Sequence, residues 1–144
     1  ERYRTMSAMF ARLTRSKFMR SGLTGVVGLV AYGGWAYYVN LSFGDETALR
    51  AGLVQGAYSL ALTMGSSYLI EQLLILYAKA GPRSTLLLAS ATSSAFALSV
   101  AYGIHWLIDT PMIFTTIMPG FLIGSVYAVI YGLSVQKLQI LSIQ

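Results

Sequence analysis

Four long stretches of the sequence contain no Asp, Glu, Lys or Arg, and they constrain the fold more than any other feature. They lie between Arg20 and Asp45, Arg50 and Glu71, Arg83 and Asp109, and Asp109 and Lys137. A run of about 20 predominantly apolar residues is long enough to cross the roughly 30 Å hydrocarbon core of a bilayer. The sequence therefore predicts four membrane-spanning helices, at about residues 21–43, 48–80, 85–108 and 111–135.

The composition favours the same class of fold. Hydrophobic residues make up 56% of the chain and charged residues only 10%, whereas a soluble domain usually carries about 25% charged residues. We expect an all-α integral membrane protein. Its four-helix transmembrane bundle would occupy residues 21–144 and follow a basic amphipathic segment at residues 1–20. The absence of cysteine excludes disulfides, thiolate catalysis and cysteine-ligated metals.

The N-terminal segment 1–20 has the pattern of a helix that lies on a membrane surface. Its apolar residues recur at spacings of three and four, and most of its basic residues fall elsewhere on the helical wheel. Such a helix binds anionic lipid through its basic face. The residues expected to contact lipid headgroups are Arg12, Arg15, Lys17 and Arg20. The alternative is a solvated leader to the first span.

The basic residues are distributed unevenly between the two sides of the predicted bundle. Nine of the ten lie in segment 1–20, in the loop between the second and third spans, or in the C-terminal tail. Four spans place these three segments on one side, which the positive-inside rule assigns to the cytoplasm. We expect an inner-membrane protein of bacterial type with both termini cytoplasmic. This topology accounts for the net charge of +5 without a nucleic-acid partner.

Small residues recur at helical spacing in the last three spans. They are Gly52 and Gly56, which continue into Ser59, Thr63 and Ser67; Ala91, Ala95, Ser99 and Gly103; and Gly120, Gly124, Ala128 and Gly132. Small side chains let helix backbones approach closely, and close packing drives helix association in lipid. We interpret the glycines and alanines, together with Ser99, as helix-packing positions. The contacts would lie within one chain, or one face would meet a partner chain.

Glu71 is the only acidic residue deep within a predicted span, one helical turn after Ser67. A carboxylate inside a membrane is costly and calls for a proton or a partner. We expect Glu71 to be protonated, or paired with Arg20 or Lys137 from the cytoplasmic ends of neighbouring helices. Two interpretations remain open at this point: a structural hydrogen-bonding group, and a coupling site for a proton or cation.

His105 and Asp109 are four residues apart at the outer end of the third span, so a continuous helix would place them on one face. They form a possible polar pair in which the carboxylate orients the imidazole. The alternative is that both are interfacial residues beside Trp106. The sequence offers no third ligand for a metal, and we expect neither a metal nor another cofactor.

No set of nucleophile, base and orienting residue is recognisable, so we expect a protein that is not an enzyme. The favoured interpretation is a small multi-pass subunit or assembly factor of a larger inner-membrane complex. Its partners would be membrane lipids and other membrane subunits, or further copies of itself. The alternative is a small oligomeric transporter or flippase for a lipid or lipid-linked substrate, with Glu71 as the coupling site.

Overall fold

The computed structural model describes residues 17–141, and all the regular elements in that range are helical. The elements are α2 (Lys17–Asn40), η1 (Leu41–Phe43), α3 (Asp45–Leu76), η2 (Ala78–Ala80), α4 (Pro82–Leu107) and α5 (Ile113–Leu141). The predicted surface segment, including Arg12 and Arg15, lies largely outside the described residues. Lys17 and Arg20 belong to α2, but their side chains are outside the described part.

Three of the helices are long and apolar enough to cross a membrane. The spans are Asp45–Leu76, Pro82–Leu107 and Ile113–Leu138, with mean hydropathies of 1.3, 1.5 and 1.9. At 1.5 Å per residue, even the 26-residue spans exceed the roughly 30 Å hydrocarbon core. The 24-residue α2 is not among them, and its side chains are described only from residue 23 onward. The protein is thus all-α in its described part, with three helices suited to a bilayer.

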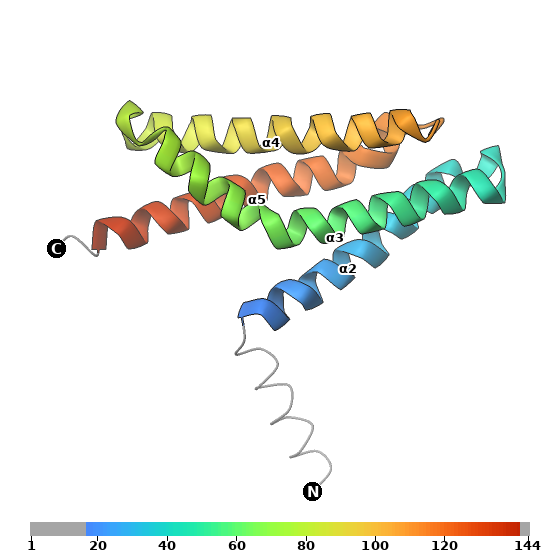
Figure 1. The fold of residues 1–144 in the computed structure, drawn as a ribbon, viewed down its shortest axis with the longest axis horizontal. Coiled ribbons are helices and arrows are strands. Elements are labelled where there is room, and N and C mark those ends of the chain that lie inside the picture. Colours follow the sequence, from blue (N-terminus) through green and yellow to red (C-terminus); the bar gives the residue numbers. More distant parts are fainter. Residues whose placement is uncertain (1–16, 142–144) are drawn as a thin grey trace, which may run out of the picture.

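Two glycines with positive φ allow the sharp turns that begin α3 and α4. Gly44 (φ 105°) precedes α3, and Gly81 (φ 85°) precedes Pro82, the first residue of α4. A side chain at either position would be strained, and proline is well suited to the first turn of a helix. These turns reverse the chain before α3 and before α4, and a third turn at Asp109 (φ 52°) reverses it before α5. Helices α3, α4 and α5 therefore run side by side in alternating directions (Figure 1).

Helix α2 packs mainly on α3, and its N-terminal half diverges from the rest of the bundle (Figure 1). The two helices meet through glycines. A Cβ added at Gly33 would lie 2.8 Å from the carbonyl oxygen of Gly52, and one at Gly56 would lie 2.9 Å from that of Leu29. The backbones are therefore in direct contact, as small residues permit in lipid.

The apolar core lies between α3, α4 and α5, toward the α3–α4 turn. It consists of Ile70, Leu73 and Leu74 from α3, with Ala89 from α4 and Ala128 from α5. The divergence of α2 leaves the region beside this core unfilled, and that region contains the site described next.

Candidate functional site

A cavity of about 820 Å³ lies between α2, α3, α4 and α5. Along α3 its lining begins at Gln55 and ends at Glu71. These residues are separated by about 24 Å along the helix axis, which is most of the roughly 30 Å hydrocarbon core. The cavity therefore extends along the direction of the helices.

Polar side chains of α3 line this cavity at four-residue spacing. They are Gln55, Ser59, Thr63, Ser67 and Glu71. Ser59 Oγ donates to the carbonyl oxygen of Gln55, and Thr63 Oγ1 donates to that of Ser59, both at 2.7 Å. These bonds direct the hydroxyl hydrogens toward the helix backbone. The oxygen lone pairs remain, so this wall presents hydrogen-bond acceptors.

Two tyrosines of α5 join the Glu71 end of the cavity. The Tyr131 hydroxyl donates to Glu71 Oε1 at 2.5 Å, and the Tyr127 hydroxyl shares a 2.7 Å hydrogen bond with Ser67 Oγ. The two rings are stacked, with centroids 5.5 Å apart and planes 17° apart. Glu71 is half-buried. The arrangement therefore places one carboxylate beside two aromatic rings.

The described partner of Glu71 is a tyrosine, which was not among the partners expected from the sequence. Lys137 is exposed, and the side chain of Arg20 lies outside the described residues. The expected shared face with Ser67 is present, because both residues line the cavity. No signal within one helix could have identified Tyr131, which is 60 residues away in the sequence.

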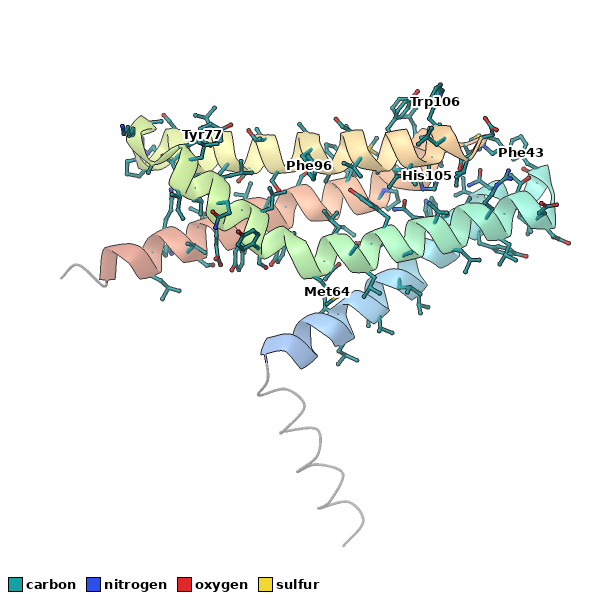
Figure 2. All side chains as sticks on the ribbon, in the orientation of Figure 1. Phe43, Met64, Tyr77, Phe96, His105 and Trp106 are labelled. Carbon is teal, nitrogen blue, oxygen red and sulfur yellow. The ribbon has the colours of Figure 1, made fainter. Side chains whose placement is uncertain are left out.

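His105 is buried at the opposite end of the bundle and points between the helices, whereas Trp106 points outward (Figure 2). His105 Nε2 lies 2.8 Å from Gln55 Oε1, and Nδ1 lies 2.9 Å from Thr110 Oγ1. The amide oxygen can only accept, so Nε2 carries the proton and Nδ1 accepts from the threonine hydroxyl. Both ring nitrogens are therefore used to join α3, α4 and the turn after α4.

The expected pairing of His105 with Asp109 does not describe this end of the molecule. Helix α4 ends at Leu107, so the shared face of residues four apart does not extend to Asp109. Asp109 is exposed with φ 52°, and the turn at this residue brings Thr110 to the imidazole. The sequence signal for the true partners was weak, because Gln55 and Thr110 are common polar residues.

Asn40 is a second buried polar side chain at this end of the bundle. Unlike His105, it was not among the candidate residues named from the sequence. Its Nδ2 donates to the carbonyl oxygen of Ala36 and to Thr116 Oγ1, both at 2.8 Å. Its Oδ1 accepts from the backbone N–H of Met112 at 3.2 Å. The side chain is fully buried. It therefore joins the end of α2 to the start of α5, beside a bond from Trp35 Nε1 to the carbonyl oxygen of Thr115.

The small residues expected at helix contacts have different positions in the structure. Gly52 and Gly56 meet α2, Ala128 is buried, and a Cβ at Gly132 would lie 2.8 Å from Leu86 Cδ1. Gly120 has ordinary contact distances, with the nearest atom 3.6 Å away on Gln55. These residues lie where helices approach each other.

The remaining small residues do not lie at close contacts within the described chain. A Cβ at Gly103 or Gly124 would meet nothing within 4 Å. Ala91, Ala95 and Ser99 are exposed on the outer surface of α4. Gly124 does not contact another helix because α5 is rotated so that this residue faces the cavity.

Residues 17–141 contain no group of three or more His, Cys, Asp or Glu that could hold a metal ion. The cavity is suited to an elongated molecule and has one carboxyl group, Glu71, at one end of its lining. No protein-family model, curated protein or solved structure matches this chain.

Proposed function

We propose that this protein is a small membrane carrier, a transporter or flippase that binds a lipid or lipid-linked substrate in the cavity between its helices. The observation that supports this proposal is the long cavity with Glu71 in its lining. An ionisable group inside a membrane-spanning segment is costly and commonly marks a substrate or ion path. The sequence alone favoured a complex subunit; the cavity gives the carrier the stronger support.

The hydrogen bonds of His105 and Glu71 support a non-catalytic role, because both side chains join structural elements of the protein. His105 engages both ring nitrogens in hydrogen bonds between structural elements. Glu71 accepts a hydrogen bond from the Tyr131 hydroxyl, which joins α3 to α5. We therefore propose binding and movement of a substrate, and no bond-breaking step.

The proposal includes a topology with four spans, α2 being the first, and with both termini in the cytoplasm of a bacterial inner membrane. Lys79 and Arg83 are at the α3–α4 turn, whereas Asp45, Glu46 and Asp109 are at the opposite end. The positive-inside rule places the first of these ends in the cytoplasm.

This topology can be tested because the chain has no cysteine. In intact cells, an impermeant thiol reagent should label Ser42→Cys and should label Ser84→Cys only after the membrane is opened. Both serines are exposed in the structure. Labelling of Ser84→Cys from outside would contradict the proposed orientation.

The carrier function predicts that filling the cavity blocks binding and leaves the fold intact. Gly124→Leu adds a side chain where a Cβ meets nothing within 4 Å and where the cavity is lined. We expect the melting temperature to change by only a few degrees, and bound lipid, measured by native mass spectrometry, to fall at least several-fold. The matched control is Gly65→Leu, which also has open space around its Cβ but is not in the cavity lining.

A loss of bound lipid in the Gly65→Leu control equal to that in Gly124→Leu would show that the cavity is not the binding site. If Gly124→Leu retains all of its bound lipid while folding normally, the carrier proposal fails.

A subunit of a larger membrane complex is the second candidate function. It is favoured by the exposed small residues Ala91, Ala95 and Ser99 on α4, where a helix of another chain could approach closely. Purification in mild detergent distinguishes the two candidates. Larger subunits in stoichiometric amounts favour the complex, and a homo-oligomer with bound lipid favours the carrier.

A further inference from the structure

The charge of the cavity lining has one sign. Glu71 is the only charged residue in the lining, which includes no Lys or Arg among the residues that the structure describes. A phosphate or carboxylate placed there would meet a carboxylate and no counter-charge, which is unfavourable where the dielectric is low. A cation would offset the cost of holding the Glu71 carboxylate inside the membrane. The lining therefore disfavours anionic groups.

Several hydroxyl groups of the lining already donate their hydrogen within the protein. The hydroxyls of Ser59, Thr63, Tyr58 and Ser125 each donate to a backbone carbonyl oxygen, at distances between 2.6 and 2.8 Å. Tyr131 donates to Glu71. Once its single hydrogen has been donated, a hydroxyl oxygen can only accept. These oxygens therefore have no hydrogen left to donate to an anionic head group.

The surroundings of Glu71 suit a positively charged nitrogen in particular. Tyr131 engages Oε1, which leaves Oε2 to accept from a ligand. The stacked rings of Tyr127 and Tyr131, with centroids 5.5 Å apart, lie beside the carboxylate, because the Tyr131 hydroxyl is bonded to it. Carboxylates form charge-assisted hydrogen bonds with ammonium groups, and aromatic faces attract cations.

The shape of the cavity suits a hydrocarbon tail. Its lining extends for roughly 24 Å along α3, from Gln55 to Glu71, so an extended chain can lie along it. Apolar side chains such as Leu62, Ile117 and Phe121 share the lining with the hydroxyl groups. An extended alkyl chain would replace lipid contacts with similar contacts in the protein.

We infer that the cavity binds amphipathic amines, with the ammonium nitrogen against Glu71 and the hydrocarbon tail extending toward Gln55. This inference rests on the proposed carrier function and specifies its substrate class. The substrate would be a lipid or lipid-linked molecule whose head carries an amine. A head that carries only phosphate would be rejected.

The inference can be tested with three probes of equal chain length: dodecylammonium, dodecanol and dodecanoate. Equilibrium binding to the full chain in lipid nanodiscs is measured with empty nanodiscs as the reference. We expect dodecylammonium to bind at least tenfold more tightly than dodecanol, with dodecanoate the weakest, because one charge-assisted hydrogen bond contributes about that factor.

Two variants test whether Glu71 is responsible. Glu71→Gln keeps the shape of the side chain and removes its charge, so the affinity for dodecylammonium should fall about tenfold while that for dodecanol stays within twofold. Glu46→Gln makes the same chemical change in the first turn of the same helix, outside the cavity lining, and should leave both affinities unchanged.

The outcomes separate the two proposals. Equal binding of the amine and the alcohol, or an undiminished affinity in Glu71→Gln, overturns the inference about amines and leaves the carrier function standing. If no probe binds above the empty nanodiscs, both proposals fail. The comparison of the three probes on the unchanged chain requires no variant. It therefore tests the preference for amines even if Glu71→Gln does not fold.

Discussion

Gly56→Leu should destabilise the protein by about 3 kcal/mol or more and release α2 from α3. A Cβ at position 56 would lie 2.9 Å from the carbonyl oxygen of Leu29 and 3.2 Å from Leu29 Cγ. The nearer atom belongs to the backbone, which cannot rotate away as a side chain can. The whole of α2 must therefore move. The measurement is thermal unfolding in detergent, followed by the circular dichroism of the helices.

The control for this prediction is again Gly65→Leu, because it has the same chemistry in the same helix and no atom within 4 Å of its Cβ. It should unfold within a few degrees of the unmodified protein. Similar melting temperatures for the two variants would mean that the loss comes from leucine in α3 as such, and that the glycine contact between α2 and α3 contributes little.

The second large effect is expected at Asn40. Asn40→Ala removes three hydrogen bonds, leaves the buried hydroxyl of Thr116 without this donor and leaves the partly buried N–H of Met112 without its acceptor. Each buried polar group left unsatisfied costs about 1–3 kcal/mol, so we expect a loss of about 3 kcal/mol. Chemical or thermal unfolding of the purified protein provides the measurement.

Two comparison variants assign the effect to particular bonds of Asn40. Thr116→Val removes only one of the partners and should cost about 1 kcal/mol. Gln72→Ala removes an amide from an exposed position of α3 and should be nearly neutral. If Asn40→Ala is as mild as Gln72→Ala, the end of α2 is not held by this side chain.

The membrane-spanning character was predictable because it depends on composition averaged over about 20 residues. Within one helix, the residues that lie on the same face were also predictable, since residues four apart share a face. Ser67 and Glu71 do line one cavity, as that rule requires. The rule does not extend beyond the end of a helix, which is why His105 and Asp109 do not form the expected pair.

Contacts between helices were not predictable in the same way. Gly56 and Gly124 are equivalent in the sequence, as small residues at helical spacing. One meets a backbone carbonyl and the other faces open space. The difference depends on how each helix is rotated and shifted against its neighbours, and one sequence does not contain that information in any local pattern. The partners of Glu71 and His105 were hidden for the same reason.

The hydrogen bonds of Trp35 and Asn40 lie in the last two turns of α2. Further toward its N-terminus, α2 contacts α3 through small residues: a Cβ at Gly33 would lie 2.8 Å from the carbonyl oxygen of Gly52, and one at Gly28 would lie 3.6 Å from Thr63 Oγ1. The polar bonds therefore fix the position of α2 along its own axis, whereas the small residues fix its distance from α3. A substitution at Asn40 and one at Gly33 would disturb two different degrees of freedom of the same helix.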